Sequence, residues 1–304
     1  MKMYFTCLFI GFLFCGKLYS QTQRIVARID TVATLKVQST PFKAKNERPF
    51  ALVAGGSKGI GFGIAEALAA RQYNLILIAR HHTPLKNAKQ ELESRYDVQV
   101  EILSYDLSKQ HSIAEISKWC IANDIPLTML CNVAGVGGTK DYLKAPLDTL
   151  LYMVDLNIKS CMSLTLQLLP LLEKNAPSQI LNVSSMAGFA PIPVKNMYSA
   201  TKSAVTFFSY SLRQQLKKKN ISVSCLTPGP VFTKPSIEAD TKRRLGFVGK
   251  WMAVPPSKVG EVAVRQTLKG KMIIVPGTLP RISSGFIRAM PRGLMASVFG
   301  SSGS

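Results

Sequence analysis

The sequence predicts a doubly wound α/β fold, a single domain in which helices cover both faces of a parallel sheet. Short apolar runs alternate with helical stretches along most of the 304 residues, and no linker divides them. The runs are too apolar to face water, which is typical of a parallel sheet between two helical layers. A glycine-rich turn follows the first run, as in nucleotide-binding sheets. About seven strands are expected, at 50–54, 74–79, 98–103, 127–131, 179–184, 221–226 and 272–275.

The turn after the first strand predicts a dinucleotide site. It reads Ala54-Gly55-Gly56-Ser57-Lys58-Gly59-Ile60-Gly61, and a helical stretch follows it. Gly55 permits a tight turn, while Gly59 and Gly61 let backbone and helix approach a pyrophosphate. The free N–H groups of the helix then face the phosphates. The spacing is G-x3-G-x-G rather than the commoner G-x-G-x-x-G, so an ordinary glycine-rich turn is the alternative.

A tyrosine and a lysine four residues apart, Tyr198 and Lys202, predict an acid–base site. On a helix these positions face the same way, so phenol and ammonium meet. A cation beside the phenol favours the phenolate, which lowers a pKa of about 10 toward the working range. Ser185, thirteen residues upstream, is placed to hold the oxygen of a reacting carbonyl. The alternatives are a serine that caps a strand end and a lysine on a wet helix face.

Together these motifs resemble those of the short-chain dehydrogenase/reductase family over roughly residues 48–278. The turn is similar to the family's TGxxxGIG, with Ala54 where Thr is usual. Further likenesses are Asp106, where an Asp contacts adenine; Asn132-Val133-Ala134-Gly135, similar to NNAG; Asn157, at the position of a catalytic Asn; and Pro228-Gly229-Pro230-Val231-Phe232-Thr233, similar to PGxxxT, whose Thr meets the nicotinamide carboxamide.

The resemblance implies a Rossmann fold and a role for each site residue. Tyr198 would protonate the oxygen of a ketone, Ser185 would hold that oxygen, and Lys202 would bind the nicotinamide ribose. Asn157 would position a water in a proton relay; the alternative is an asparagine that satisfies a buried backbone group. The helices carrying Asn157 and Tyr198 would form the interface of a homodimer or homotetramer. The expected cofactor-binding residues are Gly55, Ser57, Lys58, Gly59, Ile60, Gly61, Arg80, Asp106, Asn132, Ala134, Gly135, Tyr198, Lys202, Pro228, Gly229, Val231 and Thr233.

Charge at the second strand predicts NADP(H) rather than NAD(H). Arg80 ends the strand at 74–79, where an NAD site would place an acidic residue on the ribose. An arginine can instead pair with a 2′-phosphate through two hydrogen bonds. Lys58 adds a cation where NADP-dependent members of the family often have one. The alternative is that both are solvated surface charges.

The two ends of the chain point to a membrane. Residues 1–20 have a charged start and an apolar stretch, as in a signal peptide or a short membrane anchor. The basic linker at 21–47 favours an anchor with the catalytic domain, 48–278, facing the cytoplasm; export after cleavage is the alternative. The C-terminal arm, 279–304, mixes apolar residues with arginines and lacks acidic ones, which suits a lipid surface. Packing against the domain or a partner subunit is its alternative.

Composition argues against two other kinds of site. The excess of 38 basic over 17 acidic residues attracts polyanions, but no pattern that reads bases accompanies it, so specific nucleic-acid binding is not expected. Cysteine spacing matches neither a close pairing nor a metal-ligand set, so neither disulfides nor a metal site is expected.

The sequence therefore predicts an NADPH-dependent reductase of a hydrophobic ketone. A lid is expected between Thr233 and Pro255, and it mixes apolar and basic residues. Candidate substrates are a 3-oxoacyl thioester, a 3-keto sphingoid base and a ketosteroid. The alternative from another class is a catalytically silent NADP(H)-binding sensor or scaffold at a membrane. Such proteins commonly lose the tyrosine or the lysine, and this chain has both.

Overall fold

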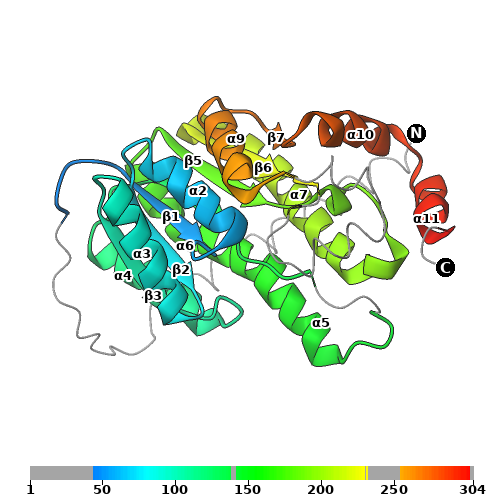
Figure 1. Ribbon diagram of the computed structural model, residues 1–304, viewed down its shortest axis with the longest axis horizontal. Coiled ribbons are helices and arrows are strands. Elements are labelled where there is room, and N and C mark those ends of the chain that lie inside the picture. Colours follow the sequence, from blue (N-terminus) through cyan, green and yellow to red (C-terminus); the bar gives the residue numbers. More distant parts are fainter. Residues whose placement is uncertain (1–43, 138–141, 230, 232–253, 302–304) are drawn as a thin grey trace, which may run out of the picture. The chain divides into compact units, whose positions relative to one another are not determined.

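A single parallel sheet of seven strands organises the part of the chain that the computed structural model describes, residues 44–137, 142–229, 231 and 254–301. The strand order is β3-β2-β1-β4-β5-β6-β7 (Figure 1). The strands are β1 (Phe50–Ala54), β2 (Asn74–Ala79), β3 (Val100–Ser104), β4 (Leu127–Asn132), β5 (Ser178–Val183), β6 (Ile221–Leu226) and β7 (Ile273–Ile274). The described residues belong to one compact unit. The predicted doubly wound fold is therefore confirmed.

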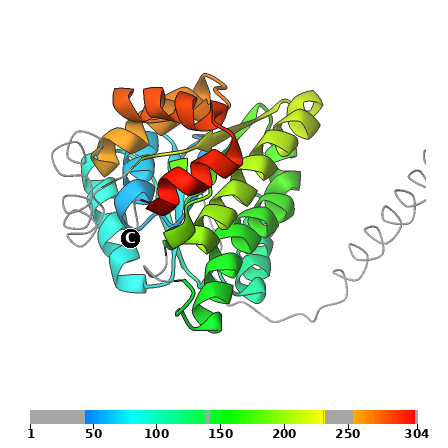
Figure 2. The same cartoon turned by 90° about the vertical axis from the view of Figure 1, so that its right-hand side faces the viewer.

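Helices cover both faces of the sheet, and Figure 2 shows the two layers from the side. One layer contains α2 (Gly59–Ala69), α3 (His82–Arg95) and α9 (Pro256–Leu268); the other contains α4 (Gln110–Ala122), α6 (Ser160–Lys174) and α7 (Asn196–Leu216). In addition, α5 (Leu147–Val154) runs into α6, and α10 (Thr278–Ala289) and α11 (Arg292–Ser301) follow β7. None of the described helices is long and apolar enough to cross a membrane.

Strand burial explains why this sheet needs helices on both sides. Every residue of β1 is buried, and Ile76, Leu77 and Ile78 in β2 are completely inaccessible to water. Each such side chain contributes roughly 1.5–3 kcal/mol of transfer free energy on burial. Cys120, Cys131, Cys161 and Cys225 are free and lie in this interior. Burial raises the pKa of each of these thiols, so they pack as small apolar groups.

A close helix pair seats α2 on α9. Gly63 and Gly260 face each other, and a Cβ added at Gly260 would lie 2.1 Å from the main-chain carbon of Gly63. Only glycine at these two positions lets the backbones approach this closely. The contact holds α2, whose N-terminus follows the glycine turn, firmly against the sheet.

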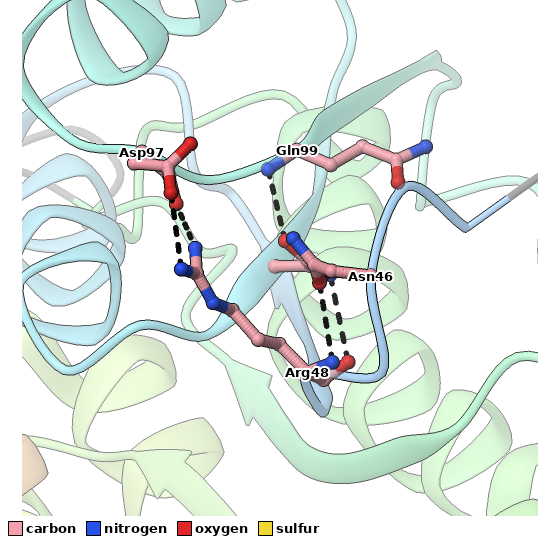
Figure 3. A network of polar contacts seen from close by, with 5 residues as sticks. Asn46, Arg48, Asp97 and Gln99 are labelled. Carbon is pink, nitrogen blue, oxygen red and sulfur yellow. Dashed lines mark hydrogen bonds and ion pairs between the residues drawn. The ribbon is translucent and has the colours of Figure 1, made fainter.

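The N-terminal segment of the described domain is bound to the starts of β2 and β3 (Figure 3). The Arg48 guanidinium pairs with the carboxylate of Asp97 over 3.0 Å and also donates to the Asp97 main-chain carbonyl. The Asn46 side chain accepts from the amide of Asn74, 2.8 Å away. The side chain of Asn74 in turn accepts from the main-chain N–H of Gln99 over 2.9 Å. The predicted segment 1–20 and residues 21–43 of the predicted basic linker, 21–47, lie outside the described residues.

Candidate active site

The glycine turn lies at the carboxyl end of β1, where the strand order reverses between β1 and β4. Gly55 has φ +93°, in the left-handed region that favours glycine, and its N–H donates to the carbonyl of Ile78 over 2.7 Å. A Cβ on Gly61 would lie 2.0 Å from the carbonyl oxygen of Gly55. The turn is therefore closed against β2 and packed tightly on the start of α2. Ligands of doubly wound folds bind at such a reversal.

The N-terminus of α2 is free to bind an anion. Lys58, the exposed residue before the helix, is extended and makes no side-chain capping bond, and the first turn has no acidic residue. The first helical bond runs from Phe62 N–H to Lys58 C=O. The N–H groups of Gly59, Ile60 and Gly61 thus remain for phosphate oxygens. This arrangement fits the pyrophosphate of a dinucleotide, as the sequence predicts.

The segment after β4 lies beside this turn. The Ala134 N–H donates to the carbonyl of Ala54 over 2.8 Å, which joins the end of β4 to the end of β1. Asn132 is buried, and its amide donates to Thr165 (2.9 Å) and Asn182 (2.8 Å). These bonds fix the strand end from beneath and bring Ala134 and Gly135 to the edge of the cofactor site.

Asn157 lies in a π-helical turn, Asp155–Lys159, between α5 and α6. Its side-chain oxygen accepts from the N–H of Val136 (2.8 Å), and its amide donates to the Val136 carbonyl (3.0 Å) and to the hydroxyl of Thr201 (3.0 Å). Only 1% of the residue is exposed. The side chain of Asn157 thus fixes the Gly135–Gly137 segment, and π turns inside α-helices often occur at functional sites. Its expected water-positioning role remains a prediction.

Tyr198, Lys202 and Ser185 come together from α7 and the end of β5. The Lys202 ammonium lies 5.9 Å from the centre of the Tyr198 ring and donates to the main-chain carbonyl of Val183 over 2.9 Å. The Ser184 hydroxyl donates to the carbonyl of Lys202, 2.7 Å away. Ser185 follows, and its hydroxyl lies against the Tyr198 phenol. Three of the four predicted catalytic side chains, those of Ser185, Tyr198 and Lys202, are therefore neighbours.

Burial dominates the proton affinities at this site. It lowers the pKa of Lys202 to about 8, against the opposing influence of the thiols of Cys161 and Cys225. Burial raises the pKa of Tyr198, and the contact with the Ser185 hydroxyl only partly opposes this. The sequence predicts a lowered pKa for Tyr198 beside Lys202; the direction in the structure is the reverse, because desolvation of the phenolate outweighs its stabilisation. Tyr198 thus holds its proton, as a proton donor must.

Two predicted cofactor residues lie at the ends of β2 and β3. Arg80 follows β2 and is exposed, and Asp106 follows β3, where its carboxylate accepts from the N–H (3.0 Å) and hydroxyl (2.8 Å) of Ser108. The hydroxyl of Ser104 donates to the carbonyl of Arg80 over 3.2 Å, which joins the two strand ends. The cation therefore lies at the edge where an adenosine would extend from the glycine turn.

The segment after β6 reaches the serine side of the site. The main-chain N–H of Met186 donates to the carbonyl of Pro228 over 3.1 Å, and a Cβ on Gly229 would lie 3.4 Å from the sulfur of Met186. Val231 is buried. Thr233 and the greater part of the predicted lid lie outside the described residues.

Two tyrosines of the candidate site, Tyr142 and Tyr152, were not predicted from the sequence. Tyr142 is buried, its hydroxyl donates to the carbonyl of Gly137, and its phenol is close enough to that of Tyr198 for the ionisation of one to disfavour that of the other. Tyr152 on α5 accepts a hydrogen bond from Arg80. Neither belongs to a motif, and both reach the site through contacts between residues far apart in sequence. Only the expectation that α5 borders the cofactor could have singled out Tyr152.

Comparison with known proteins identifies the family. The family model for short chain dehydrogenases matches residues 49–244, well over half of the chain. This chain belongs to the short-chain dehydrogenase/reductase family. The predicted family is therefore confirmed, and so is the predicted enzyme class, an oxidoreductase.

Relatives of the chain agree with this assignment. It is 33% identical over 205 residues to very-long-chain 3-oxoacyl-CoA reductase-A of Danio rerio, a match that covers 64% of each protein. It is 31% identical over 217 residues to the Rattus norvegicus very-long-chain 3-oxoacyl-CoA reductase, covering 66% of this chain and 68% of that one. The chain thus spans about two thirds of the length of these relatives.

A solved structure agrees on the fold. The short-chain dehydrogenase from Sphingobium yanoikuyae in complex with NADPH superposes with a TM-score of 0.67 at 24% identity. The superposition covers 80% of this chain and 97% of that one. That enzyme carries NADPH, the reduced form of the cofactor that Arg80 and Lys58 predict here.

Proposed function

We propose that this protein is an NADPH-dependent reductase that transfers a hydride to the ketone of a hydrophobic, lipid-like substrate. The observation that carries the proposal is the meeting of Ser185, Tyr198 and Lys202 beside an uncapped helix N-terminus at the reversal of the strand order. Bound NADPH supplies the hydride for such a reduction. The leading substrate class is a long-chain 3-oxoacyl thioester, which the names of the relatives support.

The residues of the chain supply the proton and hold the reactants. Ser185 donates to the carbonyl oxygen, so that the reacting carbon presents one face to the cofactor. Tyr198, kept protonated by its buried position, gives its proton to that oxygen as negative charge develops there. Among the described residues, the Lys202 ammonium donates to the Val183 carbonyl, and its other protons can hold the ribose hydroxyls. The reaction consumes the ketone, one hydride and one proton and yields the alcohol.

Asn157 acts as a positioning residue in this proposal. By fixing both main-chain groups of Val136, it holds Gly135 next to Lys202: a Cβ on Gly135 would lie 3.0 Å from the Asn157 oxygen and 3.3 Å from the Lys202 nitrogen. A side chain at residue 135 would therefore crowd Asn157 and Lys202, two of the proposed site residues. A water relay through Asn157 is a further expectation of the family resemblance.

Substrate length tests the proposal most simply. The purified full-length protein in detergent should oxidise NADPH with 3-oxoacyl thioesters, with kcat/KM rising as the acyl chain lengthens, because each buried CH₂ contributes about 0.8 kcal/mol. A 3-keto sphingoid base and a ketosteroid complete the substrate panel. NADPH binding without turnover of any of these ketones would instead favour the silent sensor or scaffold.

A membrane surface is the proposed location of the reaction, with the domain facing the cytoplasm. On α10, three apolar side chains lie at helical spacing and are exposed: Leu279 (39%), Ile282 (56%) and Phe286 (71%). The opposite face is buried through Pro280 and Ser284. The C-terminal arm also lacks acidic residues, so it complements anionic lipid. Export after signal-peptide cleavage remains the alternative.

Contacts of the arm link this location to the substrate. The Arg288 guanidinium lies 5.6 Å from the centre of the Phe189 ring, and Arg292 donates to the Phe189 carbonyl. Phe189 lies between Ser185 and Tyr198 in the sequence, in an apolar segment that we propose as a wall of the substrate pocket. A membrane bound to the apolar face of α10 would thus lie near the wall of the substrate pocket, where a lipid-like ketone could enter.

Vesicle flotation tests the membrane proposal. The Ile282→Ser/Phe286→Ser variant should lose most of its binding to vesicles that contain phosphatidylserine, because its exposed apolar face is gone. Ile121→Ser on α4, where the side chain is 49% exposed, is the matched control and should bind like the wild type. Equal flotation of all three proteins would contradict a role for α10.

Oligomerisation through α5, α6 and α7 is also proposed, on the family resemblance. Leu151, Leu166 and Phe207, one on each of these helices, are at least half exposed and support it. Sedimentation of the wild type and of Phe207→Ser tests the idea. A wild type that sediments as a monomer at micromolar concentration would contradict it.

A further inference from the structure

The guanidinium of Arg80 is held in one orientation by two neighbours. Its Nη1 donates to the hydroxyl of Tyr152 over 3.2 Å, and its Nε donates to the Nε2 of His81 over 3.3 Å. These contacts use one Nη1 proton and the Nε proton. The Nη2 group and the second Nη1 proton have no hydrogen bond to another described residue, and they form a pair of donors that suits phosphate. Arg80 is thus prepared for an anion rather than extended freely into solvent.

Arg80 bonds to the hydroxyl of Tyr152, whereas the carboxylate of Asp106 is bonded to Ser108. The Tyr152 phenol interacts electrostatically with both Arg80 and Asp106. Over the described ranges, Arg80 and Asp106 form no ion pair with each other, although they follow neighbouring strands. Within the described residues, Asp106 therefore does not neutralise Arg80, whose Nη1 bonds to the uncharged hydroxyl of Tyr152.

The Tyr152 hydroxyl has a proton left to give. It accepts from Arg80, and a phenol that accepts one hydrogen bond can still donate one. Burial is the largest influence on its pKa and raises it, with Asp106 acting in the same direction, so the phenol keeps its proton at neutral pH. No described residue takes that proton in a hydrogen bond. An anion that approaches Arg80 would thus also meet the Tyr152 O–H.

We propose that Tyr152 is a specificity residue for NADP(H): it orients Arg80, and its hydroxyl donates a hydrogen bond to the 2′-phosphate. The proposal rests on the proposed cofactor and goes beyond it, because it assigns recognition of the phosphate to an α5 side chain as well as to the strand end. Tyr152 precedes the π turn that holds Asn157, so one helical segment contributes to both ends of the dinucleotide site. An NADH molecule lacks the phosphate and would gain nothing from Tyr152.

Binding titrations without substrate test this role. Tyr152→Phe should narrow the difference between the Kd of NADPH and the Kd of NADH, both measured by cofactor fluorescence. NADPH should bind about tenfold more weakly, the size expected for lost hydrogen bonds to a charged group, while NADH is unchanged. Tyr96→Phe is the matched control, because Tyr96 also accepts from an arginine, Arg95 (3.3 Å), away from this site. It should leave both Kd values as in the wild type.

A double-mutant cycle separates orientation from general damage. In an Arg80→Gln background, Tyr152→Phe should keep only the part of its effect on NADPH that comes from its own hydrogen bond to the phosphate, because the residue it orients is gone. Equal weakening of NADPH and NADH, or full additivity with Arg80→Gln, would overturn the proposal. So would an unchanged Kd ratio in Tyr152→Phe when the wild type prefers NADPH. A wild type without preference for NADPH would overturn the cofactor assignment itself, and this site with it.

Discussion

The ammonium of Lys202 is hydrogen-bonded to the main-chain carbonyl of Val183, 2.9 Å away, at the last residue of β5. Ser185 follows two residues later, so the strand end that carries the serine also positions the lysine. The hydroxyl of Ser184 fixes the main chain of Lys202 from the same place. The distance in space between Ser185 and Tyr198 is therefore set by the packing of α7 against the end of β5.

The pKa of Lys202 predicts how cofactor binding depends on pH. Because burial lowers this pKa to about 8, the ammonium is charged below that pH and loses its proton above it. The Kd of NADPH should be constant from about pH 6 to about 7.5 and then rise as the cation is lost. Fluorescence titration measures it. Lys202→Met should bind weakly at every pH, and a wild-type Kd that stays flat up to about pH 9.5 would contradict the argument.

Removing the Asn157 side chain should destabilise the fold as well as the site. Asn157→Ala loses three hydrogen bonds at a buried position and leaves the Val136 main-chain groups without these partners. We expect the free energy of unfolding to fall by about 2–4 kcal/mol in urea titrations. Thr201→Val removes one of these bonds, together with the bond from the Thr201 hydroxyl to the Tyr198 carbonyl, and should cost about 1–2 kcal/mol. Equal losses in the two variants would contradict the role given to Val136.

Adding a methyl group to Gly61 should disrupt the glycine turn. The new Cβ would overlap the Gly55 carbonyl oxygen, so turn and helix must separate, and NADPH affinity should fall at least tenfold. Gly285→Ala in α10 is the control, because a Cβ there meets nothing within 4 Å. It should leave NADPH binding unchanged and raise helix stability by up to about 1 kcal/mol. Normal NADPH binding by Gly61→Ala would show that the turn is not the phosphate site.

Tyr142 should stabilise the segment that ends at Gly137, near the catalytic residues. Tyr142→Phe keeps the buried ring but loses the hydrogen bond to the Gly137 carbonyl. The free energy of unfolding should fall by about 1 kcal/mol, and kcat/KM should fall with it because this segment borders Tyr198. Denaturant titration and steady-state assay measure the two effects. Wild-type values for both would mean that the hydroxyl has no role.

Much of the fold was predictable because burial and strand pairing coincide in a parallel sheet. The expected strands at 50–54, 74–79 and 221–226 match β1, β2 and β6 residue for residue. The third was expected from 98, but β3 begins at Val100, because Val98 is buried without pairing as a strand residue. An apolar pattern reports burial, and only the partner strand decides where pairing begins.

The site was predictable in its residues and less so in its energetics. Spacing alone brings Tyr198 and Lys202 together, since one helical turn separates them. The π turn at Asn157 has no signature in hydrophobic periodicity, and Tyr142 and Tyr152 reach the site through tertiary contacts. The direction in which the Tyr198 pKa shifts could not be predicted from the sequence either, because desolvation depends on every element packed around the phenol.

Turnover by Tyr198→Phe tests the central claim most directly. Wild type and variant would be compared for conversion of a long-chain 3-oxoacyl-CoA to the 3-hydroxy product, with NADPH oxidation and product followed together. The account predicts that the variant binds NADPH like the wild type and loses about 10²–10⁴-fold in kcat, because only the proton donor is gone. Wild-type turnover in Tyr198→Phe would contradict it.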